Sequence, residues 1–284
     1  MCRKYIIGSS LETIKTRFNV EAPSLTDWSQ GQIISPGNQA LIITQENPKE
    51  IILSTFGMIP AFCKKPLSII NARAEGDKNP ENNPSFSGSK AIFRKTTFQK
   101  PLFYHRCLIL ADAFIEWSTT GNQSPYLVYL RNHVRPFAMA GLYDIWVNPA
   151  TLERQHTFTI ITVPGNTLLR KLPYQRMPVI LEKGKENRWL KTDLSLREIL
   201  AQLQKYPSHQ MNAYPIDSKI NINANDFKKR IKPIGNKVLP EDETNLRGNL
   251  NTSGWYHHKK RPSANESTST MAERIEQSKI NSDN

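Results

Sequence analysis

The second residue of the chain is a cysteine, and this position gives it chemistry that an internal cysteine lacks. If Met1 is removed, Cys2 carries a thiol and an α-amine on adjacent carbons. The amine has an ordinary pKa of about 7.7–8.0 and the thiol of about 8.5, so both nucleophiles are accessible near neutral pH. Such an aminothiol attacks an aldehyde first through its amine and then closes a five-membered ring through sulfur. The alternative is a cysteine without function that happens to follow the initiator.

Two further segments combine polar groups in patterns that suit catalysis. Asn71, Arg73 and Glu75 alternate with alanines, so in an extended segment they share one side. There Asn71 could orient a reacting group and Arg73 could bind a phosphate. Glu116 ends an apolar run beside Trp117, and a carboxyl in a partly dry setting is a candidate general acid or base with a raised pKa. The alternative for the first segment is a turn with a surface ion pair. The alternative for the second is an exposed glutamate at a strand end beside a core tryptophan.

Three other side chains suggest contacts with a nucleic acid. Arg176 precedes an apolar run and could bind a phosphate before the chain enters a buried strand. Phe56 and Met58 flank a glycine at an expected tight turn, where they could act as a wedge against stacked bases. All three could equally serve the packing of the domain.

These residues need a scaffold, and the hydrophobic pattern predicts one rich in strands. Short runs with many β-branched and aromatic residues, separated by Pro and Gly, predict strands at 33–34, 41–44, 50–53, 107–111, 126–130, 137–140, 156–163 and 179–181. Helices are expected over 9–19, 167–172, 185–190 and 193–204, the last capped by Thr192 or Asp193. This order predicts an α+β fold without regular βαβ alternation, and residues 79–90 are expected to form a surface loop.

Composition divides the chain into a basic body and a polar tail. The 284 residues include 38 Lys and Arg against 25 Asp and Glu, which gives a net charge of +13. This balance favours a polyanionic partner, nucleic acid before a membrane surface, although a generic basic protein has the same balance. Residues 236–284 are poor in apolar side chains and carry equal numbers of acids and bases. They are predicted to be a disordered tail behind one folded domain over residues 1–235.

The sequence also argues against several classes of protein. The apolar runs are far shorter than the ~20 residues that a membrane-spanning helix needs, and the first residues lack the apolar region of a secretory signal. Three cysteines without paired spacing indicate reduced thiols and neither a disulfide framework nor a zinc finger. We therefore expect a cytoplasmic protein, with no metal and no membrane partner.

The motifs gain specificity from their order along the chain. After Cys2 come Phe-Gly-Met-Ile-Pro at 56–60, Asn-Ala-Arg-Ala-Glu at 71–75, Ala-Asp-Ala-Phe-Ile-Glu-Trp at 111–117 and Arg-Met-Pro at 176–178. Over about residues 2–235 this series resembles the SRAP (SOS response-associated peptidase) family of abasic-site-processing proteins. The resemblance implies a single compact, β-rich domain with flanking helices, which binds single-stranded DNA and the ends of adjoining duplex, for instance on damaged DNA in the nucleoid.

The resemblance also implies a role for each motif. Cys2 would form a thiazolidine crosslink with the ring-opened aldehyde of an abasic site and so shield the lesion. Asn71 would position the open sugar or the amine, and Glu116 would be the acid and base of the Schiff-base, lyase-type chemistry. The side chains that would contact DNA are Arg3, Phe56, Met58, Arg73, Trp117 and Arg176. No cofactor or metal is implied, and a monomer is expected.

The chain departs from the family pattern at three places. Phe56 replaces a tryptophan, and Cys2-Arg3-Lys4 replaces Cys-Gly-Arg. The largest departure is Tyr174, which stands where the family has a histidine. A histidine titrates near pH 6.5 and can give and take a proton, whereas a tyrosine near 10 mostly donates a hydrogen bond. We count Tyr174 among the catalytic candidates and expect crosslinking with altered kinetics.

Two other functions stay open on the sequence alone. Tyr174 leaves room for a relative that binds single-stranded DNA without crosslinking it, unless His105 or His133 replaces the missing histidine from elsewhere in the fold. The third possibility is a thiol peptidase. The family name implies self-cleavage after Met1, which an ordinary methionine aminopeptidase could also perform, but no spaced Cys/His pair supports hydrolysis of other proteins.

Overall fold

Short strands make up most of the chain, as the β-branched runs predict. The computed structural model describes residues 2–22, 25, 28, 31–117, 124–131, 134–172, 174–218 and 227–241, so the predicted tail beyond 241 and the candidate His133 lie outside it. The strands are β1 (Lys4–Ile7), β2 (Gln32–Ile34), β3 (Gln39–Thr44), β4 (Ile51–Phe56), β5 (Asn71–Arg73), β6 (Arg106–Ala111), β7 (Ala113–Trp117), β8 (Pro125–Leu130), β9 (Phe137–Val147), β10 (Arg154–Pro164), β11 (Arg176–Pro178) and β12 (Met211–Pro215).

The helices are short and lie between the strands. They are α1 (Leu11–Phe18), α2 (Thr96–Tyr104), α3 (Thr167–Lys171), α4 (Glu186–Trp189), α5 (Leu196–Ala201), α6 (Phe227–Arg230) and the 3₁₀ turns η1 (Gly76–Lys78), η2 (Ile92–Arg94) and η3 (Ser208–Gln210). Within the described ranges, none is long and apolar enough to cross a membrane.

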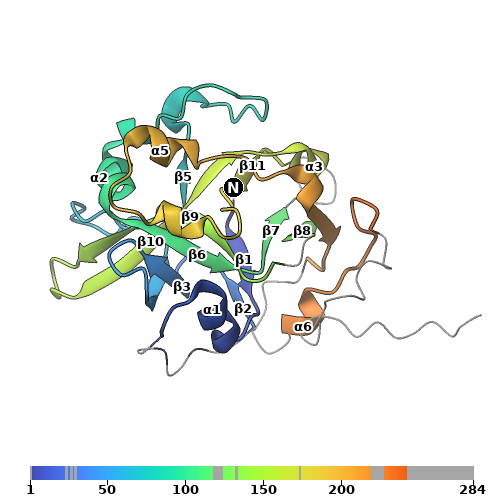
Figure 1. Ribbon diagram of the computed structural model, residues 1–284, viewed down its shortest axis with the longest axis horizontal. Helices are drawn as coiled ribbons and strands as arrows, with labels where there is room; N and C mark the ends of the chain where they lie inside the picture. The colour runs from blue at the N-terminus through green and yellow to red at the C-terminus, as the bar shows by residue number, and fades with distance from the viewer. Residues whose placement is uncertain are drawn as a thin grey trace, which may run out of the picture. The chain divides into compact units, whose positions relative to one another are not determined.

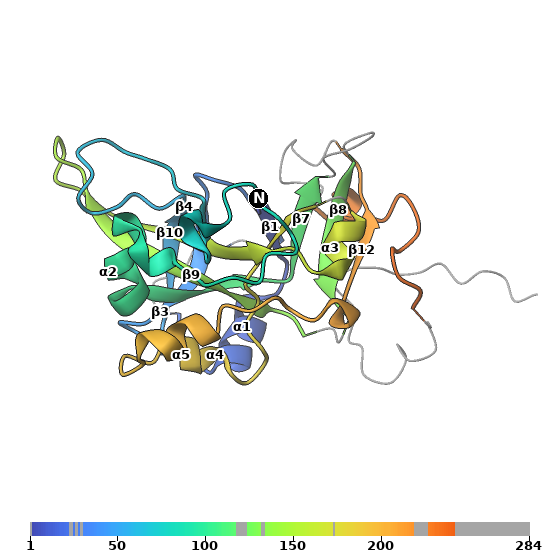
Figure 2. The ribbon, with the colours of Figure 1, turned by 90° about the horizontal axis from the view of Figure 1, so that it is seen from above.

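The strands form two sheets, one of which closes on itself. A five-stranded sheet has the order β12-β8-β7-β1-β2, and a seven-stranded sheet has the order β11-β10-β4-β3-β6-β9, with β5 paired to β10. Because β10 also pairs with β9, the second sheet is barrel-like. In Figures 1 and 2, β1 lies between this closed sheet and strands β7 and β8. Separate helices beside mostly antiparallel strands confirm the predicted α+β class.

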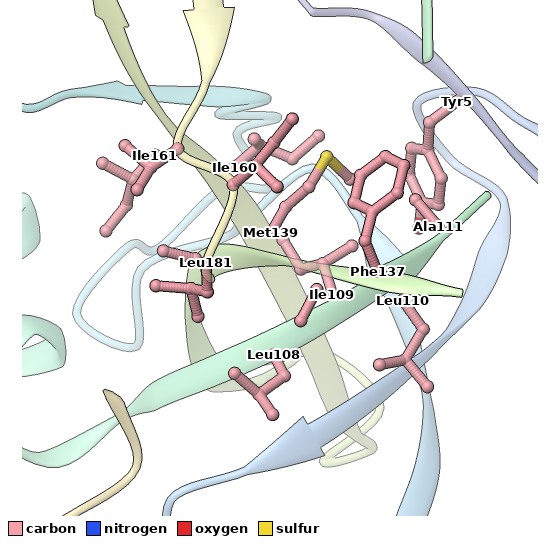
Figure 3. Packing of buried hydrophobic residues seen from close by; sticks show 14 of the residues in the cluster. Tyr5, Leu108, Ile109, Leu110, Ala111, Phe137, Met139, Ile160, Ile161 and Leu181 are labelled. Atoms are coloured by element: carbon pink, nitrogen blue, oxygen red, sulfur yellow. The ribbon is translucent and has the colours of Figure 1, made fainter. Parts of the chain in front are cut away.

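Aromatic side chains from both sheets meet in the core. Phe56 stacks on Phe158 with ring centroids 5.2 Å apart, and Tyr5 meets Phe56 edge-on at 5.9 Å. Figure 3 shows Phe137 and Met139 packed together, with the ring of Tyr5 beside Phe137. These contacts fix the position of β1 and of the segment that precedes it.

Two predicted elements differ most clearly from the structure. The helix expected over 193–204 is only α5, because Ser195 caps it instead of Thr192 or Asp193. The Ser195 hydroxyl accepts from the Glu198 N–H, and the Glu198 side chain bonds back to the cap. The strand expected at 179–181 is wrong, since β11 ends at residue 178 and only an isolated bridge follows.

The folded part of the chain continues past the predicted boundary at residue 235. Val238 donates its N–H to a β12 carbonyl at 2.8 Å, and the Asn212 side chain makes two hydrogen bonds to the backbone of Leu239. The Glu241 carboxylate accepts from Asn212 at 2.7 Å and from the Tyr129 hydroxyl at 2.9 Å. Residues 237–241, which we call the strap, therefore belong to the domain.

Candidate active site and nucleic-acid interface

The candidate nucleophile lies just before β1. Cys2 is fully buried, and its backbone carbonyl accepts a hydrogen bond from Asn71 Nδ2 at 3.0 Å. Asn71 opens β5, which β10 holds in parallel register with Ile160 paired to Asn71. The fold thereby joins two candidate catalytic residues that are 69 positions apart in the chain.

Glu116 supplies the acidic group of this site. It lies in β7, which pairs with β1, and it is only 2 % exposed. Side chains alternate along a strand, so Glu116 faces the interior while Trp117 faces the other way and is half-exposed. Burial raises the pKa of Glu116 to about 8. At pH 7 the carboxyl is therefore mostly protonated and can donate a proton.

The Cys2 thiol is held in its neutral form. Burial raises its pKa well above the ordinary value, and Glu116, once it is ionised at higher pH, raises it further. A neutral thiol is a poor nucleophile, because the thiolate is the reactive form. This environment favours an order of reaction in which an amine attacks before the sulfur does.

Three buried polar atoms around Cys2 have no hydrogen-bond partner among the described residues. They are Asn71 Oδ1, Glu116 Oε1 and the hydroxyl of Tyr5. Buried polar groups nearly always have partners, so unpaired ones call for water or a ligand. Burial and then the charge of Cys2 raise the pKa of Tyr5, which links this hydroxyl to the site. Sequence reasoning missed Tyr5, and its place three residues after Cys2 was the available signal.

The position that departs from the family pattern is buried in the same hydrophobic core as Cys2. Tyr174 is 7 % exposed, and no hydrogen bond joins it to Cys2, Asn71 or Glu116 within the described residues. His105, the described candidate to replace the missing histidine, pairs instead with Asp144 at 3.4 Å. Across the same residues, no group of three or more His, Cys, Asp or Glu could hold a metal ion.

Arg176 is buried in an ion pair. Its guanidinium contacts both carboxylate oxygens of Glu75, at 2.7 and 3.1 Å, and donates to the carbonyl of Thr162 at 3.0 Å. Only 2 % of the residue is exposed. The predicted phosphate contact of Arg176 does not fit this placement. The arginine instead fastens the segment after β5 to β10 and β11.

The predicted wedge does not fit either, because Phe56 and Met58 are both fully buried. Phe56 belongs to the aromatic core, and Met58 exchanges backbone hydrogen bonds with Ile69 at 3.0 and 3.1 Å. Gly57 between them has a φ of 117°, and a Cβ there would lie 2.4 Å from the Ser68 hydroxyl oxygen. The motif therefore builds a tight turn and not a surface for bases.

Other predicted DNA contacts remain accessible near Cys2. Arg3 is exposed, and Arg73 is half-buried with one guanidinium N–H donating to the Asn79 carbonyl at 3.3 Å. Lys4 Nζ lies 5.7 Å from the centroid of the Trp117 ring. These side chains form a basic and aromatic rim on the segments that carry Cys2, Asn71 and Glu116.

Sequence reasoning missed an exposed loop that also carries basic and apolar side chains. Residues 61–68 lead directly into β5, and the Trp146 indole holds the loop by donating to the Cys63 carbonyl at 2.7 Å. Its exposed side chains include Phe62, Lys64, Lys65 and Leu67. Phe62 is 66 % exposed, which is unusual for an aromatic ring on an anchored loop. Apolar side chains on either side of two lysines were the signal for a surface that meets a polyanion with stacked bases.

Fold and site together define a class: a β-rich α+β domain with a buried cysteine at position 2, set against an asparagine and a protonated carboxyl. The chain belongs to the SRAP family, since the family described as "SOS response associated peptidase (SRAP)" matches residues 1–223. This match confirms the resemblance inferred from the ordered motifs.

Individual relatives agree with the assignment. The abasic site processing protein YoqW of Bacillus subtilis is 30% identical over 241 residues, covering 82% of this chain and 99% of YoqW. The abasic site processing protein HMCES of Gallus gallus is 28% identical over 167 residues, covering 51% of this chain and 49% of HMCES. A crystal structure of a protein from Bacteroides thetaiotaomicron is 25% identical with a TM-score of 0.71, covering 82% of this chain and 99% of that one.

Proposed function

We propose that this protein binds single-stranded DNA at abasic sites and joins the lesion covalently to Cys2 after Met1 has been removed. The observation that carries the proposal is the meeting of Cys2 with Asn71 and with a carboxyl of pKa about 8. Membership of a family whose curated relatives are abasic site processing proteins supports it.

The first step of the proposed reaction uses the amine. The freed α-amine of Cys2 adds to the aldehyde carbon of the ring-opened abasic sugar and forms a carbinolamine. Protonated Glu116 donates its proton to the carbinolamine hydroxyl, water leaves, and a protonated Schiff base forms. A carboxyl with an ordinary pKa would be ionised at pH 7 and could not make this donation.

The second step closes the ring. The ionised Glu116 takes the proton of the Cys2 thiol, and the sulfur forms a bond to the Schiff-base carbon while the nitrogen receives the electron pair of the C=N bond. Glu116 returns to its protonated form, and the balance of the two steps is the loss of one water. The product is a thiazolidine, which contains the sulfur and nitrogen of Cys2.

Asn71 positions the reacting group in this scheme. Its Nδ2 holds the carbonyl of Cys2, which fixes the orientation of the adjacent α-carbon and amine. Its Oδ1 has no described partner and can accept from the amine or from a hydroxyl of the open sugar. The amide thus connects nucleophile and substrate.

Strand binding is assigned to the basic and aromatic rim. Arg3 and Arg73 supply charge for phosphates, and Trp117 with the 61–68 loop supplies rings and apolar side chains for bases. Stacking and phosphate contacts do not read base edges, so sequence preference is expected to be weak.

Intact-protein mass spectrometry tests the proposal. The protein is weighed before and after incubation with a single-stranded oligonucleotide that carries one abasic site. We expect a protein without Met1 that gains the mass of the oligonucleotide less one water, and Cys2→Ala should gain nothing while still binding an undamaged strand. Wild type that lacks Met1 and binds the strand without this mass gain would refute the crosslink. It would leave a non-covalent binding module, the alternative that Tyr174 in place of the family's histidine keeps open.

A further inference from the structure

A hollow opens where β5 ends. It has a volume of about 350 Å³ and lies between the 85–90 loop and the segment 203–205. Its inner wall includes Glu75, four residues beyond Asn71 in the chain. The volume lies within the range of small-molecule sites, and no role in the proposed crosslink accounts for it.

The hollow carries excess positive charge. Lys90 and Lys205 line it from two segments far apart in the sequence, and neither forms an ion pair within the described residues. Glu75 in the wall is neutralised by Arg176. Burial lowers the pKa of both lysines, the charge of Arg170 lowers that of Lys205 further, and the charge of Glu75 offsets part of the shift in each. An anion in the hollow would compensate for the desolvation of the two ammonium groups.

Neutral donors line the same space. The residues Ser85 and Ser87 contribute to the wall, and the backbone N–H groups of Ser87 and Gly88 donate to no other residue in the described part of the chain. Consecutive loop N–H groups beside lysines suit an oxyanion with several oxygens. Phe86 adds an aromatic side to the wall. The hollow is larger than a bare phosphate. A group attached to the phosphate therefore has room to pack against the Phe86 ring.

We propose that this hollow, which we call the 85–90 pocket, binds the phosphate of a nucleotide. Lys90 and Lys205 contact the phosphoryl oxygens, and Phe86 packs against the attached sugar or base. A free nucleoside monophosphate and a nucleotide unit of a bound strand carry the same chemistry. The strand as source rests on the proposed function, because it requires DNA to be bound beside the pocket, whereas the free nucleotide does not.

Two titrations on the full-length protein distinguish the sources. Undamaged, fluorescein-labelled oligothymidylate is titrated by anisotropy at several salt concentrations, and deoxyadenosine monophosphate is titrated by calorimetry. Wild type is compared with Lys90→Met and Lys205→Met, which keep an unbranched chain and remove one charge. Lys49→Met is the matched control, because Lys49 is exposed and lies outside the pocket.

If the strand fills the pocket, each pocket variant should lower the slope of log affinity against log salt by about 0.7, the value for one lost contact to single-stranded DNA. If a free nucleotide fills it, the monophosphate should bind wild type and Lys49→Met but neither pocket variant, with the strand slope unchanged. The inference is overturned if both pocket variants match Lys49→Met in both titrations. Failure of wild type to bind any strand would instead count against the proposed function.

Discussion

Glu116 shows how one residue connects stability with chemistry. Its carboxyl has a pKa of about 8 in the folded protein and about 4.5 when exposed, so the folded state holds a proton that the unfolded state loses. A carboxyl with a raised folded pKa favours folding below pH 4.5, and this contribution is lost as the pH rises towards 8. By linkage the loss is on the order of 5 kcal/mol at most, which the rest of the domain has to offset.

Glu116→Gln should therefore stabilise the protein, and more so at higher pH. The amide keeps the shape of the protonated acid but cannot ionise. The variant therefore avoids the loss of folding stability that wild type undergoes between pH 4.5 and 8. Thermal unfolding followed at pH 5 and pH 8 measures this. We expect the variant to melt above wild type at pH 8 and close to it at pH 5. An equal difference at both pH values would mean that Glu116 does not titrate in this window.

The same variant should lose crosslinking rate. Wild type needs an unprotonated α-amine and a protonated Glu116, so its rate should rise towards pH 8 and fall above it. Glu116→Gln cannot donate the proton, so at pH 7 we expect a rate lower by about 10²-fold or more, within the range for general acid catalysis, and no fall above pH 8. Single-turnover crosslinking to an abasic oligonucleotide, quenched at intervals and resolved on a denaturing gel, gives both profiles. A variant that keeps the wild-type profile would remove Glu116 from the mechanism.

At the scale of elements, two arginines near β5 lie in different environments, and their removal should have different consequences. Arg176 on β11 is buried against Glu75, whereas Arg73 within β5 is half-exposed. Removing one member of a buried ion pair leaves an uncompensated charge, so Arg176→Ala should cost about 3–5 kcal/mol in the free energy of unfolding. Urea denaturation measures that loss. A cost below about 1 kcal/mol would show that the pair is not buried as described.

Arg73→Ala is the comparison that separates structure from binding. We expect little change in the free energy of unfolding, because the hydrogen bonds described for its guanidinium are long, at 3.3 Å to the Asn79 carbonyl and 3.5 Å to the Pro80 carbonyl. For binding of an undamaged single strand, the slope of log affinity against log salt should fall by about 0.7 in this variant if the arginine neutralises one phosphate. An unchanged slope would move Arg73 out of the DNA contacts.

The elements also show where sequence reasoning ends. Runs of β-branched residues located most strands, and ordered motifs located Cys2, Asn71 and Glu116, because those signals are local. The partner of Arg176 is 101 residues away, so a lone arginine before a strand could not be distinguished from a phosphate ligand. Phe56 was misassigned for the same reason, since burial depends on Tyr5 and Phe158 from other strands. Pro101 inside α2 concealed that helix, because proline is rare in helix interiors.

At the scale of the whole molecule, the strap decides where the domain ends. The family match stops at residue 223, yet residues 237–241 pack on β8 and β12 through Asn212, Tyr129 and Glu241. Hydrogen bonds and its ion pair with Lys237 hold the pKa of Glu241 below its usual range despite partial burial. A cut at 235, the boundary that composition suggests, would leave the Asn212 and Tyr129 side chains without these partners.

Two truncations therefore have different expected outcomes. A chain ending at residue 241 should unfold at the same urea midpoint as full-length protein, because every hydrogen bond of the strap is retained. A chain ending at residue 235 loses the bonds to Asn212 and Tyr129, and at about 1 kcal/mol for each net hydrogen bond we expect a loss of about 2–4 kcal/mol. Crosslinking by the shorter chain should persist at temperatures where it is still folded, since Cys2 and Glu116 lie outside the strap. If both truncations unfold like full-length protein, the strap contributes nothing to stability and the compositional boundary is the functional one.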